Sequence, residues 1–582
     1  MAYDNGEAVQ ELIQLVDTDG TTRTYRNPSH ILLIDKDGII HNEADYRELL
    51  DQIIRHNDVA TLNRYLAKFP NHGIAPGEVY YDDPFYKAAS RGSTDVLRVL
   101  LKHYNTLYNA DPSQISDPLD QRGFQLLVVA CQHAQLDTVL FLLDSQPPLG
   151  TVCAGDGYSN TALLAAASSV NQLRQPYFEP GTKPPSYDHQ IWARNSIARS
   201  EELMHMLLDR GACARDVLMY RNGPLVLRET ALGLAIPHAS YRLVRRLIDE
   251  GADIHAKQYY CHDMTGFGRA EPEDVTALHI ACLNWNMEGI RALLDHQRTA
   301  SNDPDYNSVD LLACRDSNGC SPLHWAAAGP EPFDARIISD GAEVPPQVSL
   351  FELLLADNPG VINDLDKQGV TPLYYAVTCH IGCRSLHTFL AIQYLCSHGA
   401  DASISDKRGR GLLHNIGYSS AYSKPIENAL LDLLVENGAD INRVDPTDGR
   451  TPLHIMTQTL RQVEGARHLI RLGADIHAKD SKGDTPLHKA ARGFFPPCYG
   501  FGRVEEMPTV ADKIQAQDEM FAAILDEAGG DESSDWMDQQ NSSGETPRQL
   551  RENQRVKWRE EEEARGKPRT RGGARGRGRG QP

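Results

Sequence analysis

The chain has 582 residues, too many for one ordinary hydrophobic core, so several domains or a repeat array are expected. Its 41% hydrophobic and 24% charged residues are typical of a folded soluble protein, and no apolar run is long enough to span a bilayer. The net charge is −21, but residues 564–582 hold seven Arg and Lys and no acid, which leaves −28 on residues 1–563. This balance argues against a nucleic-acid groove in the acidic body and favours a partner with a basic surface.

The N-terminal sequence has early acidic residues and no apolar core, so we expect no secretory signal. The eleven cysteines stand at irregular spacing, and several occupy apolar positions of expected helices, which favours buried thiols over disulfides. We therefore expect a soluble monomer of the cytoplasm and/or nucleus, without a membrane segment.

Residues 1–45 contain short apolar runs separated by Asp-Gly turns, which predict an N-terminal leader or a small hairpin. A helical pattern begins at about residue 46, and residues 56–70 are expected to form the second helix of an atypical first unit. Ten further units follow, each with a first helix that starts 34 to 69 residues after the one before. The first helices are expected to start at Asp83, Phe124, Thr161, Thr230, Thr276, Ser321, Thr371, Gly411, Thr451 and Thr485. Matching second helices are expected at 97–104, 139–145, 203–212, 243–253, 290–296, 350–358, 392–401 and 430–440.

Residues 438–491 contain the clearest copies of the unit. Gly438-Ala439-Asp440-Ile441 leads to Thr451-Pro452-Leu453-His454, and the same pattern returns 34 residues later, from Gly473 to His488. Thr451 is a good N-cap, Pro452 suits the first helical position, and Gly473 suits the left-handed position after a helix. One such helix pair cannot bury its own apolar face, so the units must stack.

These motifs resemble the ankyrin-repeat family, whose period is about 33 residues. The resemblance covers roughly residues 45–560 and is strongest from 276 to 491. It implies an all-α ankyrin-repeat solenoid of about ten helix-turn-helix repeats with finger loops and a disordered C-terminal tail. The expected parts are a leader at 1–45, the solenoid at 46–530, a degenerate C-terminal cap or acidic helix at 531–563, and an Arg-Gly tail at 564–582.

The resemblance also implies a function: a non-catalytic scaffold or adaptor that binds protein partners along its concave face. It places two sets of candidate contacts on that face, although each residue could equally be an ordinary solvated turn residue. The helix-one set is Leu283, Asn284, Tyr418, Ser419, Gln458 and Thr459, and the finger-tip set is Asp316, Asn318, Lys367, Gln368, Lys407, Arg408, Asp448 and Lys482.

Polar, Pro-rich insertions interrupt the repeats at 171–199, 257–275, 329–349 and 494–515. Such insertions map to surface loops, where they are either without function or specific for a partner. The 257–275 insertion lies at an expected finger loop. Its aromatic residues Tyr259, Tyr260 and Phe267 are of the kind that interfaces favour.

Signatures of catalysis are missing from the sequence: there is no phosphate-binding loop, nucleophile elbow, HExxH motif or kinase set. The histidines of the Thr-Pro-Leu-His motifs recur at repeat spacing, which spreads them along a line and favours structural hydrogen bonds. Cys379-His380-Ile381-Gly382-Cys383, with His387 and Cys396 beyond, superficially resembles a metal cluster but lacks a second tight pair. We expect no enzyme, no metal and no cofactor.

The tail at 564–582 is Gly-, Pro- and Arg-rich, and this composition predicts disorder. It resembles RGG-type RNA-binding tails and substrates of arginine methylation. A weak contact with nucleic acid or an acidic partner through this tail is the alternative function, and a merely solvated tail is equally compatible with its length.

Overall fold

A computed structural model provides the structure of the chain. It describes residues 12–16, 22–26, 32–34, 40–42, 46–68, 83–110, 119–155, 160–171, 187–222, 225–260, 272–300, 310–329, 346–380, 386–419, 425–495, 499–500, 503–504, 508–530 and 535–566. The chain divides into two compact units. Unit 1 comprises Met1–Pro176, Pro185–Tyr259 and Glu288–Thr299, and unit 2 comprises Tyr177–Pro184, Tyr260–Met287 and Ala300–Pro582.

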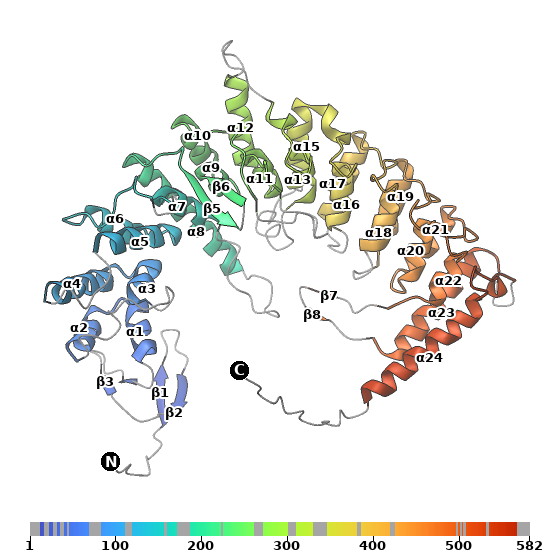
Figure 1. The fold of residues 1–582 in the computed structure, drawn as a ribbon, viewed down its shortest axis with the longest axis horizontal. Helices are drawn as coiled ribbons and strands as arrows, with labels where there is room; N and C mark the ends of the chain where they lie inside the picture. The colour runs from blue at the N-terminus through green and yellow to red at the C-terminus, as the bar shows by residue number, and fades with distance from the viewer. Residues whose placement is uncertain are drawn as a thin grey trace, which may run out of the picture. The chain divides into compact units, whose positions relative to one another are not determined.

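Unit 1 is built from pairs of antiparallel helices that pack in series (Figure 1). The first helices α1, α3, α5, α7 and α9 pack one on the next, and the second helices α2, α4 and α6 form another series. The helices are α1 (Tyr46–Arg55), α2 (Val59–Lys68), α3 (Pro84–Arg91), α4 (Thr94–Ala110), α5 (Leu119–Gln132), α6 (Leu136–Asp144), α7 (Ala162–Asn171), α8 (Tyr187–Asp209), α9 (Ala231–Ala235), α10 (Tyr241–Asp249) and α12 (Met287–Ala300).

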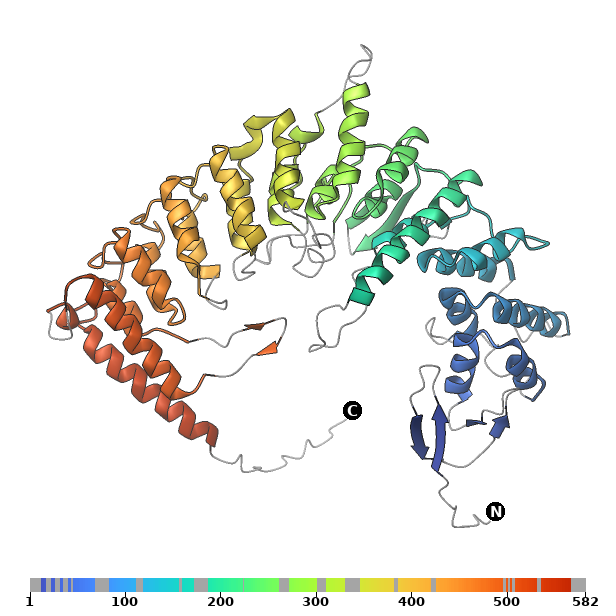
Figure 2. The ribbon, with the colours of Figure 1, turned by 180° about the vertical axis from the view of Figure 1, so that it is seen from behind.

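Unit 2 repeats this arrangement. Its first-row helices α11, α13, α16, α18, α20, α22 and α24 pack in series, and the second-row helices α15, α17, α19, α21 and α23 form a parallel series (Figure 2). The helices are α11 (Ala277–Leu283), η4 (Leu311–Ala313), α13 (Pro322–Ala328), α15 (Pro346–Asp357), η5 (Pro359–Asn363), α16 (Pro372–His380), α17 (Leu386–Ser397), α18 (Leu412–Ser419), α19 (Asn428–Glu436), α20 (Pro452–Gln458), α21 (Val463–Arg471), α22 (Pro486–Ala491), α23 (Val510–Glu527), η7 (Asp535–Asp538) and α24 (Pro547–Gly566).

The described strands form four antiparallel pairs. They are β1 (Leu12–Val16) with β2 (Thr22–Arg26), β3 (Leu32–Ile34) with β4 (Ile40–Asn42), β5 (Val217–Asn222) with β6 (Leu225–Thr230), and β7 (Tyr499–Gly500) with β8 (Arg503–Val504). The first two pairs lie within residues 1–45, for which the sequence predicted a leader or a small hairpin. The β5–β6 hairpin, which leads into α9, was not predicted.

One histidine in each of five first helices of unit 2 links its repeat to the next. We call these five residues, His279, His324, His414, His454 and His488, the capping histidines. Nδ1 of His454 lies 3.1 Å from the backbone nitrogen of Thr451, and its Nε2 lies 3.0 Å from the carbonyl oxygen of Asp484 in the next repeat. Since Nε2 faces a carbonyl, it carries the ring proton and Nδ1 accepts. His279, His324, His414 and His488 make the same pair of contacts, which confirms the predicted structural role.

Most first helices begin where the sequence predicted, because an N-cap residue marks them, followed in five cases by a proline. The exception is α5, which begins at Leu119, five residues before the predicted start at Phe124. The second helices begin earlier than predicted, and α8 does so by sixteen residues because it extends through part of the 171–199 insertion. Helix α24 overlaps residues 531–563, for which the sequence predicted a degenerate cap or acidic helix, whereas residues 567–582 lie outside the described residues. Among the described residues, we find no helix that is both long and apolar enough to cross a membrane.

Candidate functional site

Six turns of unit 2 precede first-row helices and share one design. These finger turns are residues 316–319, 366–369, 406–409, 445–449, 480–483 and 541–544. In five of them, Oδ1 of the first residue accepts the N–H groups two and four positions later; for Asp366 the donors are Gln368 (2.7 Å) and Val370 (3.0 Å). Each turn ends in a glycine with φ between 71° and 84°, a left-handed conformation that glycine adopts without strain.

In three of the turns, the second oxygen of the turn aspartate binds a side chain of the following helix, whereas Oδ2 of Asp406 binds Arg410, just before α18. Oδ2 of Asp316 accepts from Trp325 Nε1 (3.0 Å), Oδ2 of Asp366 from the Tyr375 hydroxyl (2.9 Å), and Oδ2 of Asp480 contacts Lys489 Nζ (2.5 Å). In these three turns the partner stands nine residues after the aspartate. These carboxylates are buried and engaged, so the charged groups that these turns present to solvent belong to their middle residues.

Backbone hydrogen bonds link one finger turn to the next. The N–H of Lys367 donates to Asn318 O (2.8 Å), that of Lys407 to Gln368 O (2.7 Å), and that of Ser481 to Asp448 O (2.8 Å). Ser317 and Ser542 donate in the same way to Glu273 and Lys482. Pro446 occupies the donor position of its turn, and the ladder is interrupted there because proline has no N–H. The turns are therefore fixed in register on both sides of this position.

Four exposed middle residues of these turns are cationic, and the other exposed middle residues are uncharged. Lys367, Lys407, Arg408 and Lys482 are exposed, and no ion pair of theirs occurs among the described residues. The half-buried Asp448 is already paired with Arg450 at 3.0 Å. Of the remaining predicted tip residues, Gln368 is exposed and Asn318 is half-buried.

Exposed aromatic rings lie at the end of α18 and just after α22. Tyr418 is 37% exposed at the end of α18, and Phe494, just after α22, is also 37% exposed. The Arg410 guanidinium lies 5.9 Å from the Tyr418 ring centre, a cation–π distance. Burial raises the pKa of the Tyr418 hydroxyl, so it stays protonated at neutral pH. Gln458, a predicted contact at the end of α20, is half-buried.

The expectation of exposure was wrong for six predicted contact residues. Tyr260 lies edge-on against Trp325, with ring centres 5.4 Å apart, and Tyr259 donates its N–H to Arg228 O. The Asn284 side chain donates to Ile280 O in its own helix, and the Asp316 carboxylate is engaged as above. All four of these residues are buried, and so are Leu283 and Thr459. The side chains of Phe267 and Ser419 lie outside the described residues.

Phe494 and Arg410 were missed by sequence reasoning. Phe494 pairs its backbone with the end of α20, since its N–H donates to Gln458 O and its carbonyl accepts from Leu460. The only signal was the Phe-Phe pair that follows the last clear repeat, within a range that was predicted to be an insertion.

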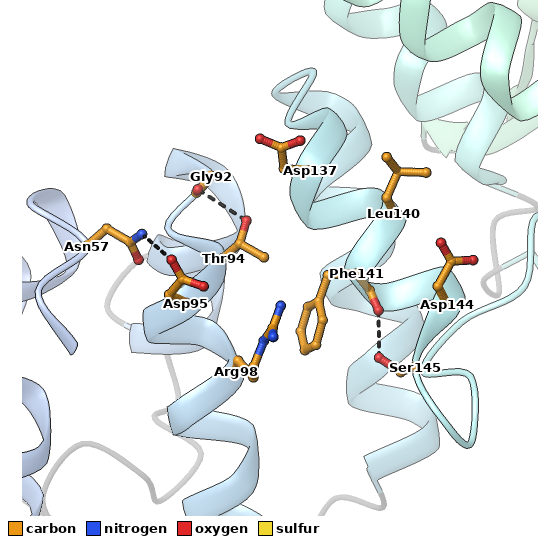
Figure 3. Close-up of a pocket in the computed structure, with 10 residues that line it drawn as sticks. All are labelled: Asn57, Gly92, Thr94, Asp95, Arg98, Asp137, Leu140, Phe141, Asp144 and Ser145. Atoms are coloured by element: carbon orange, nitrogen blue, oxygen red, sulfur yellow. Dashed lines mark hydrogen bonds between the residues drawn. The ribbon is translucent and has the colours of Figure 1, made fainter.

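A separate groove of about 630 Å³ lies between α4 and α6 in unit 1 (Figure 3). Its described lining includes Asp95, Asp137 and Asp144, with the Arg98 guanidinium 4.9 Å from the Phe141 ring centre. Asp95 accepts from Asn57 Nδ2 (3.2 Å), and Asp144 is paired with Arg210 (2.6 Å). The lining has no nucleophile adjacent to a base, so the geometry does not indicate catalysis.

Metal and thiol chemistry gain no support. Among the residues that the structure describes, no group of three or more His, Cys, Asp or Glu is arranged to hold a metal ion. Residues 381–385 and the side chains of Cys379, His380 and His387 lie outside them. Burial raises the pKa of the Cys396 thiol to about 11, so it is protonated and unreactive at neutral pH.

Comparison with known proteins points to one family. Residues 419–496 match the family of ankyrin repeats (3 copies). The chain is 25% identical over 210 residues to the palmitoyltransferase AKR1 of Lachancea kluyveri, covering 36% of this chain and 24% of that protein. It is 27% identical over 218 residues to the nuclear factor NF-kappa-B p105 subunit of Gallus gallus, covering 37% and 19%. The chain thus spans about a quarter or less of the length of these relatives. Among solved structures, the ankyrin repeat domain of Bcl-3 matches 44% of this chain and 92% of that chain, with 22% identity and a TM-score of 0.29.

Proposed function

Since this chain is an ankyrin-repeat protein, we propose that it is a non-catalytic scaffold or adaptor whose partners bind to the finger turns and first-row helix ends of unit 2. One observation carries the proposal most directly: the finger turns use their backbone groups internally and expose only their middle side chains. A surface that is already ordered loses little entropy when a partner binds. The exposed rings of Tyr418 and Phe494 add the apolar area that protein interfaces favour.

Protein partners are the class that ankyrin repeats imply, while fold alone does not choose among them. One relative is named a palmitoyltransferase, so the absence of catalysis in this chain is stated as part of the proposal. It is supported by the capping histidines, whose two ring nitrogens are both used in structural hydrogen bonds. We also propose that the protein is a monomer of the cytoplasm or nucleus, which sedimentation of the pure protein and imaging of a tagged copy would check.

The test is affinity purification with cross-linking, using full-length protein and a Tyr418→Ala/Phe494→Ala variant. Both rings are partly exposed, so their removal should leave the fold intact and reduce recovery of specific partners. A matched control is Tyr241→Ala/Met219→Ala, which removes two comparably exposed apolar side chains from unit 1. The proposal fails if partners cross-link elsewhere and are lost equally from both variants or from neither.

A second candidate function rests on the Arg-Gly tail at 564–582. Cations on a chain of this composition could follow phosphates, while the repeats recruit proteins. Deleting residues 567–582 and measuring RNA binding at two salt concentrations separates this function from the first. Absent or unchanged RNA binding would end it.

A further inference from the structure

The exposed charge of unit 2's finger turns is opposite in sign to the charge of the whole chain. The chain carries a net −21, yet Lys367, Lys407, Arg408 and Lys482 project from its finger turns. We call these four residues the cationic finger row. We propose that this row recognises an acidic, extended segment of a partner protein, an inference that rests on the proposed function and specifies the partner's chemistry.

The positive charge exposed at the finger turns results from which charged side chains of each turn are buried. The aspartates Asp366, Asp406 and Asp480 are buried, whereas the lysine or arginine one or two positions after each is exposed. The only half-exposed acid of these turns, Asp448, is paired with Arg450. A ligand that approaches the tips therefore meets cations first, and screening over about 8 Å at physiological salt weakens the field of distant acids.

The shape of the ligand follows from the backbone ladder. The turn of Lys367 is hydrogen-bonded to that of Lys407 and Arg408, and the turn at 445–449 is bonded to that of Lys482. The cations thus lie on three of four successive turns, with the turn at 445–449 between Arg408 and Lys482 contributing none, and a compact anion could meet only part of the row. The turn N–H groups are already bonded to the turn aspartates, so recognition depends on the ammonium groups and on the Arg408 guanidinium, which can bind a carboxylate through two hydrogen bonds.

A polypeptide fits this row better than a nucleic acid. The buried aspartates directly beneath the tips oppose a dense polyphosphate more strongly than a segment with spaced carboxylates. Stacking surfaces for successive bases are also few, since Tyr418 is the exposed ring beside these turns among the described residues and already lies close to Arg410. The acidic ligand also differs from the basic partner that the net charge favours, so the two inferences make opposite predictions.

The test measures the binding of labelled peptides to the full-length protein by fluorescence anisotropy. The probes are a peptide of alternating Glu and Ser, the same peptide with Gln or Lys in place of Glu, and an oligouridine of similar length. We expect the Glu peptide to bind more tightly than the Gln and Lys peptides, and its affinity to fall by about tenfold between about 50 mM and 300 mM salt.

Two charge-matched variants locate this binding. In Lys367→Glu/Lys407→Glu/Arg408→Glu/Lys482→Glu, affinity for the Glu peptide should fall by about tenfold or more, because attraction becomes repulsion. The control Lys102→Glu/Arg194→Glu/Arg199→Glu/Arg291→Glu makes the same charge change at exposed unit 1 residues and should bind within about twofold of the parent protein. The Arg-Gly tail is present in all three proteins, so its own attraction for the peptide cancels. Equal melting temperatures would show that the variants are folded.

Three results would overturn the inference. They are equal binding of the Glu and Gln peptides, equal weakening by both variants, or row-dependent binding of oligouridine in preference to the Glu peptide. Failure here is distinguishable from failure of the proposed function. A partner that is lost with Tyr418→Ala/Phe494→Ala but retained after reversal of the finger row would leave the binding face in place and exclude acidic recognition.

Discussion

Burial lowers the pKa of all five capping histidines, to about 3 for His279 and about 4 for His324. For His279, the neighbouring Arg315 and His324 act in the same direction, while the Cys320 carbonyl opposes it. A lowered histidine pKa means that the unfolded chain binds protons more readily than the folded one. Their contribution to stability is therefore complete above the unfolded pKa of about 6.5 and is lost as the pH falls toward the folded values.

The first prediction is an acid-dependent loss of stability centred on these histidines. At pH 5, His279 and His324 should each lower the free energy of unfolding by about 2 kcal/mol relative to neutral pH. The variant His279→Gln should lose about 1 kcal/mol at pH 7.5 but show a smaller decrease between pH 7.5 and 5. Gln is a reasonable replacement because Gln549 accepts the N–H of Thr546 at the equivalent position of the last repeat. The measurement is urea unfolding followed by tryptophan fluorescence, since Trp325 contacts His279. An unchanged pH slope in the variant would contradict the assignment.

The second prediction concerns the turn aspartates. Asp366→Ala leaves the N–H groups of Gln368 and Val370 and the Tyr375 hydroxyl without their acceptor, so we expect a loss of about 3 kcal/mol. Asp366→Asn keeps the Oδ1 acceptor, as Asn541 does in the last turn, and should cost about 1 kcal/mol. Thermal unfolding and amide hydrogen exchange at residues 366–370 would check the order. Equal losses would mean that the acceptor geometry is not what stabilises the turn.

Single residues also show which structural roles the sequence could predict and which it could not. The Thr-Pro-Leu-His motifs predicted caps and structural histidines, because each of these residues acts mainly within its own turn or at the junction to the next. Burial of Asp316 could not be predicted in this way, since aspartate is usually exposed and its indole partner is defined only by the fold. Tyr260 was misplaced for the same reason, as the Trp325 ring that it contacts lies 65 positions away in the sequence.

At the scale of the elements, α9 shows how a repeat without the capping histidine is completed. Gly233 stands three residues after Thr230, where five repeats of unit 2 have histidine. The buried side chain of Gln258, from the following segment, accepts the Thr230 N–H (3.2 Å) and hydroxyl (3.1 Å) instead. A Cβ on Gly233 would overlap the Gln258 carboxamide, so the two residues are matched. The hydrogen bond keeps its position, although its acceptor comes from Gln258 and not from a histidine of the helix.

This pairing gives the third prediction. Gln258→Ala leaves the Thr230 N–H unpaired and should cost about 2 kcal/mol. Gly233→His alone should also destabilise the protein, because the imidazole and Gln258 would occupy the same space. The double variant Gly233→His/Gln258→Ala should recover part of the loss, since the new imidazole can accept as His279 does. Thermal unfolding of the three variants tests the coupling, and strictly additive losses would exclude it.

The second-row helices and hairpins mark the limit of prediction at this scale. Their apolar stretches were recognised, but α8 begins with residues that lack apolar periodicity and so could not be assigned to a helix. The β5–β6 hairpin was not predicted, because its residues lie between two motifs that already account for a complete repeat. Fold class and first-helix positions were predictable because local capping chemistry sets them, whereas insertions depend on what they pack against.

At the scale of the molecule, the net charge differs in sign from the charge exposed at the finger turns. The net charge favoured a basic partner because it counts every acidic residue, whether buried or exposed. The fold separates the charges by burying Asp366, Asp406 and Asp480 and exposing the cationic finger row. Which charges a partner meets is thus a property of the turn geometry, and composition alone does not contain it.

The C-terminal end of unit 2 is closed by a charged contact as well as an apolar one. Asp484, fully buried, contacts Lys489 (2.8 Å), Arg492 (2.7 Å) and Asn541 (2.8 Å). Burial opposes its ionisation, but hydrogen bonds from Lys489 and Asn541 outweigh this and hold the pKa of Asp484 below its usual range. Helix α24 then covers α22 and α23, with Trp558 buried. The last finger turn and α24 therefore complete the polar and apolar contacts of the repeat before them.

The fourth prediction follows from this arrangement and from the nearest-neighbour coupling of stacked repeats. Deleting residues 531–582 removes Asn541 and Trp558, which exposes the face of α22 and leaves the Asp484 cluster without one of its partners. Hydrogen exchange should then accelerate by about tenfold or more in α22 and α23, less in α20 and α21, and not in α1–α7 of unit 1. Deletion of residues 567–582 alone is the matched control and should change none of these rates. Equal acceleration in both units would mean that the chain unfolds as one cooperative block, in which case the effect of losing the cap would not decay from repeat to repeat.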